Sequence, residues 1–293
     1  MSDALPARWR ERRWRLLPWA LILGAILAPS SARATTSWAE RVITIASWNA
    51  DLLPELGGDE CRARNPTEYA ARRHMVEQLD ADIIVFRGVE TIAAAEQLFN
   101  PRRYIVIMAP RPERTSEICA GSLERRLTRQ DIGFAMRRGL RFSVHYLRNL
   151  PVTGLSGVEI GLRVRGGRHL RLLSFPLPEC VTPVCARLDD ENRNLERWVQ
   201  RAIRGPYRFI VVRGDGRTSE SDARFPLSVG LSLASAGAQS RCDPSRPFFA
   251  EDFLLDRRAL ASMRSFREVS FDFGDRRSSH CPVVLQISLW GGR

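Results

Sequence analysis

Polar residues stand where several apolar, strand-like segments of this 293-residue chain end. The four segments are Ser47-Trp48-Asn49, Arg87-Gly88-Val89-Glu90, Arg213-Gly214-Asp215-Gly216-Arg217 and, just before the last apolar run, Ser278-Ser279-His280. In α/β folds the strand ends meet on one side of the sheet and build a site there. Guanidinium groups bind phosphate and carboxylate bidentately, so the arginines in these segments suit an anionic ligand. We therefore expect the four segments to form one site.

The elements that must position this site alternate along the chain. β-rich runs predict strands at residues 42–47, 83–86, 104–108, 133–136, 170–175, 209–212, 253–255 and 283–289. Helices are expected from the cap at Asn65-Pro66 to about Leu79, from Thr91 through Leu98, and at residues 188–203, where apolar residues recur at helical spacing. Strands alternating with helices imply an α/β domain.

A few residues in these elements invite functional interpretations, but their contexts favour structural ones. Trp198 stands at helical spacing within residues 188–203 and is expected in the core. His74 and His145 lie in helix-like and strand-like contexts, and we expect them at the surface or in packing. His169 precedes a strand among arginines and is expected to be solvated.

The N-terminus predicts export. Residues 1–34 have the pattern of a signal peptide: arginines between positions 8 and 15, an apolar stretch at residues 16–28, and the cleavage pattern Ala32-Arg33-Ala34. The apolar run is shorter than the roughly 20 residues needed to span a bilayer, so cleavage is favoured over anchoring. We expect a single domain over residues 35–293, periplasmic or secreted, with no stable membrane span after cleavage.

Charge and cysteines narrow the classes of partner. The net charge is +12, and every cation is arginine because the chain has no lysine. Polyanions and anionic membrane surfaces are therefore possible partners.

Six cysteines in an exported chain suggest disulfides, with 15 possible connectivities; Cys180 with Cys185 and Cys61 with Cys119 are our guesses. Neither CxxC nor HxxxH spacing accompanies them, which disfavours a metal cluster.

The order of the polar strand ends resembles the endonuclease/exonuclease/phosphatase superfamily, which has the DNase-I-like fold. The family's Trp-Asn strand end is matched by Trp48-Asn49, and its Asp-Ile-Ile-x-x-Gln-Glu-Val strand by residues 82–89 except at the Gln-Glu. Ser174-Phe175-Pro176-Leu177 stands at the family's Ser-x-His-Leu, and Gly214-Asp215-Gly216-Arg217 at its Gly-Asp-Phe-Asn. Asp252 matches a late Asp, and residues 278–282 match the closing Ser-Asp-His-x-Pro. The resemblance spans residues 43–289 and implies a four-layered α/β/β/α sandwich, two packed sheets flanked by helices.

The departures from the family pattern fall at its chemistry, which is metal-dependent hydrolysis of phosphate esters. Mg²⁺ needs hard oxygen ligands, and the family's principal metal carboxylate falls at Gly88. A second carboxylate falls at Ser279, the Asn beside the attacking water at Arg217, and a phosphate-binding His at Pro176. The resemblance therefore implies that most of the metal site is lost.

Four site positions survive: Asn49, Asp215, Asp252 and His280. In the family the Asp–His pair holds a charged imidazole against the phosphate, and the Asp matching Asp215 activates water. Glu90 is a weak candidate to replace the missing carboxylate, since it lies two residues beyond Gly88. Arg87, Arg213 and Arg217 are candidate anion-binding residues; alternatively, one guanidinium pairs with Asp215 and replaces the charge of the metal.

Three hypotheses follow. The first is an exported pseudoenzyme of this family, kept as a binding or structural protein, with no cofactor expected. The second is a weak or altered phosphodiesterase or phosphatase that uses Asp215, His280, Asp252 and Glu90 with Mg²⁺ or Mn²⁺. The third is a basic protein that binds a phosphate-bearing anion, nucleic acid or lipopolysaccharide; its binding should weaken steeply as salt rises.

Overall fold

The computed structural model describes residues 42–53, 66–109, 116–118, 126–128, 131–147, 157–163, 169–174, 185–214, 230–236, 238–240, 242, 249, 251–271 and 281–289. All of them belong to one compact unit, Thr36–Arg293. The predicted signal peptide, residues 1–34, lies outside the described residues. Within the described residues, no helix combines the length and the apolar character needed to cross a membrane.

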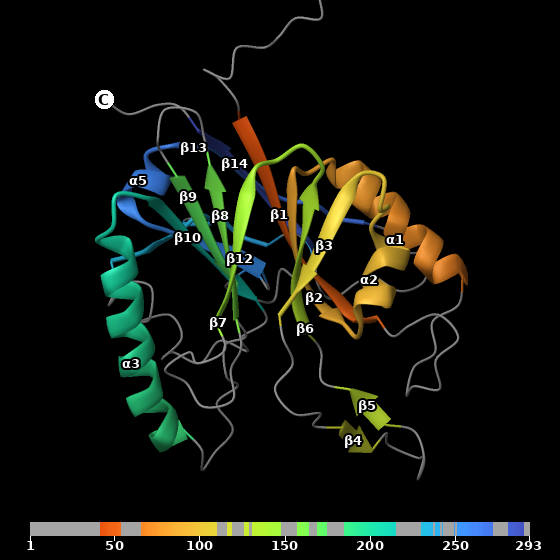
Figure 1. Ribbon diagram of the computed structural model, residues 1–293, viewed down its shortest axis with the longest axis horizontal. Coiled ribbons are helices and arrows are strands. Elements are labelled where there is room, and N and C mark those ends of the chain that lie inside the picture. Colours follow the sequence, from red (N-terminus) through yellow and green to blue (C-terminus); the bar gives the residue numbers. More distant parts are fainter. Residues whose placement is uncertain are drawn as a thin grey trace, which may run out of the picture. The chain divides into compact units, whose positions relative to one another are not determined.

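Two six-stranded sheets form the centre of this unit (Figure 1). The first has the order β13-β14-β1-β2-β6-β3, and the second β11-β12-β10-β9-β8-β7. β1 runs parallel to β2 and β9 parallel to β10, whereas the other pairs are antiparallel. The first sheet contains β1 (Val42–Leu53), β2 (Ile83–Val89), β3 (Tyr104–Met108), β6 (Asp131–Arg137), β13 (Met263–Glu268) and β14 (Val283–Ser288).

The second sheet contains β7 (Phe142–Leu147), β8 (Gly157–Arg163), β9 (His169–Ser174), β10 (Arg208–Gly214), β11 (Ser232–Leu233) and β12 (Glu251–Leu255). A separate hairpin pairs β4 (Ser116–Ile118) with β5 (Arg126–Thr128). The helices are α1 (Pro66–Leu79), α2 (Ile92–Leu98), α3 (Cys185–Ile203) and the short α5 (Arg257–Leu260). The predicted helices therefore form, and α2 is capped by Thr91, whose hydroxyl accepts from the Ala94 N–H at 3.0 Å.

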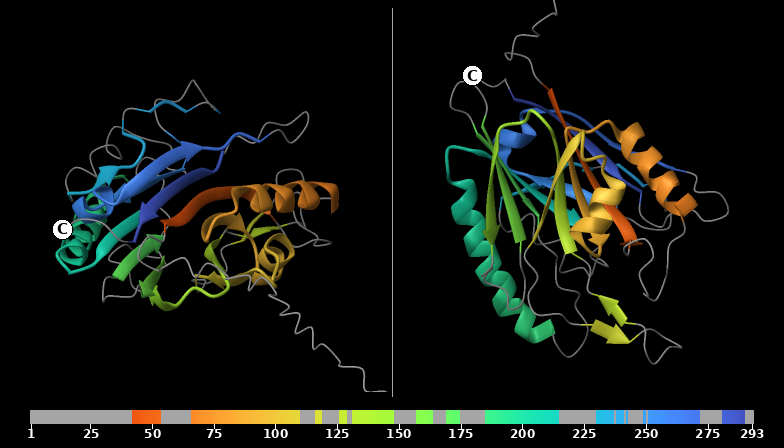
Figure 2. Two further views of the ribbon diagram at one scale, coloured as in Figure 1. Left: turned by 90° about the horizontal axis from the view of Figure 1, so that it is seen from above. Right: turned by 45° about the vertical axis from the view of Figure 1, so that its right-hand side comes forward.

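Three apolar clusters hold the layers together. The largest lies between the sheets, where β1 contributes Ile43 and Ile45 and β8 contributes Val158 and Ile160. A second cluster joins the outer face of the first sheet to α1 and α2, and a third joins the second sheet to α3. In Figure 2 α1 and α2 lie outside the first sheet, and α3 lies outside the second. The result is the predicted four-layered α/β/β/α sandwich.

Two predicted strand ends are corrected. β1 continues past Ser47 to Leu53, and β2 continues past Phe86 to Val89. Their parallel pairing extends through Trp48 and Asn49. Trp48 is buried against the helices, and backbone hydrogen bonds between strands form whether the side chains are polar or apolar. Asn49 and Arg87 are therefore strand residues rather than loop residues.

Candidate functional site

Asn49 and Arg87 are neighbours across the β1–β2 pair. Their Cα atoms are register partners, and both side chains are buried, at 7% and 8% exposed. Asn49 shares its strand face with Ile43 and Ile45, which belong to the core between the sheets, because side chains alternate along a strand. Val283, at the start of β14, pairs with Ser47, so β14 begins beside the Asn49 end of β1. This strand end gathers two of the four predicted segments.

The Arg87 guanidinium connects the two sheets. Its Nη2 donates to the carbonyl oxygen of Val212 in β10, at 2.9 Å. A charge this deeply buried is costly without hydrogen-bond acceptors, so the carbonyl contact is structural. The predicted anion-binding residue therefore lies in the interior, where it also places a fixed positive charge on the site side of the first sheet.

Gly88 interrupts the alternation of β2. Its φ is 70°, in the left-handed region that side chains rarely adopt. The register shifts between Phe86 and Val89, and both of these side chains pack on the helix side although they are three residues apart. A carboxylate at position 88 would thus need a left-handed backbone at a cost of about 1–2 kcal/mol, or a rebuilt bulge.

Glu90 lies just beyond β2 and is half-buried. Its backbone N–H donates to the Leu53 carbonyl at 3.0 Å, which holds the end of β2 against β1. The bulge at Gly88 removes the simple two-residue alternation that would place Glu90 on the same face as position 88. The geometric basis for Glu90 as the substitute carboxylate is therefore weakened.

Asp252 comes from the second sheet and is buried, at 4% exposed. Its Oδ1 accepts from the Phe253 backbone N–H at 2.7 Å, and its Oδ2 accepts from the Ser235 hydroxyl. In β10, Arg213 is its register partner. The carboxylate is thus oriented by two donors, and no motif in the sequence pointed to the hydroxyl of Ser235.

Several predicted site residues lie outside the described part of the chain: Pro176, Asp215, Gly216, Arg217, Ser279 and His280, together with the side chain of Arg213. Cys281, which directly follows His280, is described and buried. It forms a disulfide with Cys242, 39 residues away, so the chain beside His280 is covalently fixed. The guessed pairs Cys180–Cys185 and Cys61–Cys119 involve residues outside the described side chains.

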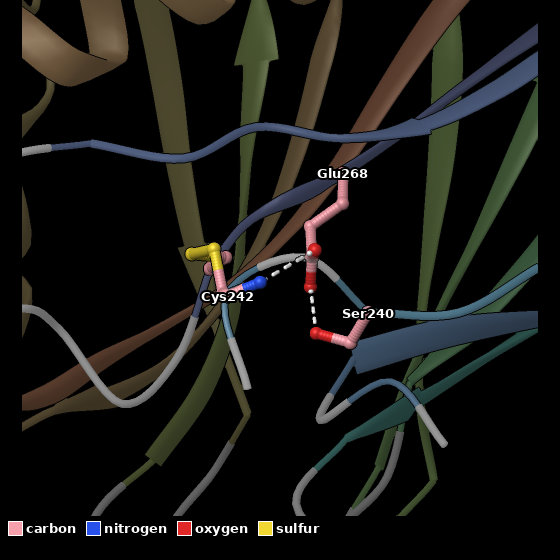
Figure 3. Close-up of a disulfide and its surroundings, with 4 residues drawn as sticks. Ser240, Cys242 and Glu268 are labelled. Atoms are coloured by element: carbon pink, nitrogen blue, oxygen red, sulfur yellow. Dashed lines mark hydrogen bonds between the residues drawn. A yellow bond between two sulfur atoms is a disulfide. The ribbon is translucent and has the colours of Figure 1, made fainter. Parts of the chain in front are cut away.

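Glu268 completes the surroundings of this disulfide (Figure 3). Its Oε1 accepts from the Ser240 hydroxyl at 2.8 Å, and its Oε2 accepts from the Cys242 backbone N–H at 3.1 Å. Potential metal-ligating atoms of Cys242, Glu268 and Cys281 lie within 4.8 Å of one another. The cysteine sulfurs are bonded to each other, however, and metals bind the thiolate. The disulfide and the two hydrogen bonds to Glu268 therefore have a structural role: they hold Ser240 and Cys242, which follow β11, in place.

Comparison with known proteins identifies the fold. No protein-family model matches the sequence, and no curated protein sequence matches it. Among solved structures, the human Nocturnin catalytic domain with bound sulfate has a TM-score of 0.57 at 15% identity, covering 84% of this chain and 96% of that one. A variant of the Neisseria 3′ phosphatase NExo, bound to a product DNA hairpin, has a TM-score of 0.56 at 14% identity, covering 84% and 99%.

A third match is an endonuclease/exonuclease/phosphatase family protein from Bacteroides thetaiotaomicron, with a TM-score of 0.55 at 11% identity and coverage of 85% and 98%. At these identities the likeness shows the fold. It confirms the resemblance predicted from the polar strand ends.

Proposed function

Because this chain has the fold of endonuclease/exonuclease/phosphatase structures, we propose that it is an exported protein of that type whose metal site for phosphoester hydrolysis is largely lost. It acts in the periplasm or outside the cell as a pseudoenzyme that binds rather than cleaves. The signal-peptide pattern at residues 1–34 supports export.

One observation carries the loss of catalysis. At the position that should supply the principal carboxylate, Gly88 has no side chain and a φ of 70°, and the preceding residue buries a guanidinium. Mg²⁺ needs carboxylate oxygens, and position 88 supplies none. Among the described residues, these two positions therefore support a site that lacks its principal metal ligand.

The expected size of the defect decides between inactivity and slow turnover. Removing one preorganised group commonly lowers the rate by about 10²–10³. The four departures do not multiply, since groups that act together fail together. Even one such loss at the metal, joined by the loss of the phosphate-binding His at position 176, leaves no ordinary turnover.

Restoring the site tests the proposal. The mature protein would be assayed with Mg²⁺ and Mn²⁺ on plasmid DNA and on a phosphomonoester. The restored variant would carry Gly88→Glu, Pro176→His, Arg217→Asn and Ser279→Asp, together with Arg87→Gln. We expect a silent natural protein and metal-dependent cleavage by the restored one. Adding His280→Ala to the restored variant is the matched control and should remove the gain.

Ordinary turnover by the natural protein would overturn the proposal. Export is tested separately by expression with residues 1–34 intact, followed by N-terminal mass analysis, which should give a chain beginning at Thr35. A cytoplasmic, uncleaved chain would contradict export without affecting the catalytic test.

A second function, weak phosphoester hydrolysis, is supported by Asp252. Its buried carboxylate accepts hydrogen bonds from two donors, an arrangement that suits a residue orienting an imidazole. This hypothesis predicts slow metal-dependent cleavage that disappears in both Asp252→Asn and His280→Ala. Activity that survives both changes would point to a contaminating hydrolase.

A further inference from the structure

A pocket of about 490 Å³ lies on the second sheet, on the face away from the first. Helix α3 packs against β10 on this face and leaves the strands β7 and β8 less covered. The volume falls in the range of small-molecule sites. The lining residues come from three strands, α3 and the segment before β10: Ser143, His145, Leu147, Glu159, Gly161, Arg163, Arg171, Trp198 and Tyr207.

Gly161 forms the floor of the pocket. Val158, Ile160 and Leu162 point into the core between the sheets, so Glu159, Gly161 and Arg163 share the opposite face. Gly161 pairs with Ser143 on one side and with Arg171 on the other. A Cβ at position 161 would come within 2.7 Å of the Ser143 Oγ. The Ser143 hydroxyl therefore lies beside Gly161, and a side chain at position 161 would displace it and narrow the pocket.

One wall of the pocket is a partly buried ion pair. Glu159 is 4% exposed, and the Arg171 guanidinium meets it in a bidentate contact, with Nε donating to Oε1 at 2.9 Å and Nη2 donating to Oε2. The same guanidinium lies over the rings of Tyr207 and Phe209, at 5.6 and 5.7 Å from their centroids. Arg171 is fixed by these contacts, and two of its five N–H groups serve Glu159.

The remaining lining supplies further donors and an aromatic surface. Arg163 and His145 lie on the paired strands β8 and β7, and both are exposed and line the pocket. Trp198 was expected in the core, but it is half-buried: it packs against the α3 cluster and also borders the pocket. With Arg163 and Arg171 opposed by Glu159 alone among the lining residues, the pocket keeps a positive balance beside aromatic rings.

We propose that this pocket binds a small oxyanion attached to a flat ring, an aromatic carboxylate or an aryl phosphate. Arg163 and the remaining donors of Arg171 hold the oxyanion, because guanidinium groups match carboxylate and phosphate geometry. Trp198 and Tyr207 contact the ring. The pocket lies on the opposite face of the sheet from the core that leads to Asn49 and Arg87, so the inference does not depend on the proposed function.

Calorimetric titration of the mature protein tests the inference with two matched pairs of probes: benzoate against acetate, and phenyl phosphate against inorganic phosphate. We expect each ring-bearing anion to bind more tightly than its ringless partner. The stronger of benzoate and phenyl phosphate identifies the oxyanion. Failure of both ring-bearing probes to bind, or equal binding by the ringless ones, would overturn the proposal.

Variants locate the binding. Arg163→Ala should weaken binding about tenfold or more, as expected for loss of a charge-assisted hydrogen bond. Gly161→Val should abolish binding by filling the floor, and Trp198→Leu should remove the advantage of the ring. Arg201→Ala, an exposed change on the same helix, is the control and should bind normally. Unchanged affinity in Arg163→Ala, in a variant that melts like the natural protein, would place the binding elsewhere and contradict the assignment.

Discussion

At the scale of single residues, the proposed pseudoenzyme differs from an active phosphoesterase in charge as well as in ligand count. Position 88 lacks a carboxylate, and position 87 adds a guanidinium whose hydrogen bond to Val212 connects the sheets. On this account, the family's metal carboxylate is absent at position 88, and the neighbouring Arg87 makes a contact that holds the two sheets together. Such an arrangement does not revert by a single substitution.

The backbone at Gly88 gives the first prediction. Gly88→Ala should lower the free energy of unfolding by about 1–2 kcal/mol, because a Cβ disfavours the left-handed conformation. Gly88→Asn should cost less, since Asn visits that region more readily. Urea unfolding of the two variants measures the difference. Equal stability of Gly88→Ala and the natural protein would show that φ at this residue is not positive.

At the scale of elements, α5 is capped by a buried carboxylate. The Asp256 side chain accepts from the Ala259 N–H at 2.7 Å, and burial raises the pKa of this carboxyl despite that bond. Because the pKa of Asp256 is higher in the folded state than in the unfolded state, protonated Asp256 favours folding. This contribution to stability is complete below the unfolded pKa and is lost as pH rises through the folded pKa. Ionised Asp256 therefore costs stability at neutral pH.

Asp256→Asn should raise the melting temperature at pH 7, because Asn caps a helix equally well without carrying a buried charge. The advantage should shrink as pH falls through the folded pKa of Asp256. Thermal melts of both proteins from about pH 3 to pH 7 test this. The difference in melting temperature should change at a pH above the reference carboxyl pKa of about 3.9. A variant less stable than the natural protein at pH 7 would mean that the carboxylate's charge is favourable there.

The elements also show what could be predicted from local residue types. Apolar strands such as β3, at Tyr104–Met108, and the Thr91 cap of α2 were predictable because burial and capping depend on nearby residues. The ends of β1 and β2 were not, since backbone pairing continues under the polar Asn49 and Arg87. The strand β8 was missed although Val158, Ile160 and Leu162 alternate along it, because its two glycines lower the strand propensity of the segment.

Candidate site residues could be predicted only where they lie within a recognisable sequence motif. The order of polar strand ends identified the fold, and it located Gly88 and Asp252. It could not reveal the left-handed backbone at Gly88 or the hydroxyl of Ser235 beside Asp252, because both depend on segments brought together by folding. The Cys242–Cys281 pair was likewise one choice among many connectivities.

At the scale of the whole molecule, this disulfide joins the two sheets. Cys242 follows β11 of the second sheet, and Cys281 precedes β14 of the first. Replacing both cysteines by Ala should lower the free energy of unfolding by about 4 kcal/mol, from the loop-closure entropy of the unfolded chain. Urea unfolding without reductant measures the loss, and Ser240→Ala, which removes one hydrogen bond to Glu268, is the milder comparison. A loss no larger than that of Ser240→Ala would contradict a stabilising role.

At this scale we propose that a DNase-I-like scaffold surrounds a site that no longer holds a metal ion. Direct titration of the mature protein with Mn²⁺, followed by electron paramagnetic resonance of the unbound ion, tests it most directly. The account predicts no saturable binding by the natural chain, and one bound ion per chain in the restored variant. Stoichiometric, tight Mn²⁺ binding by the natural chain, abolished by Glu90→Gln, would contradict it.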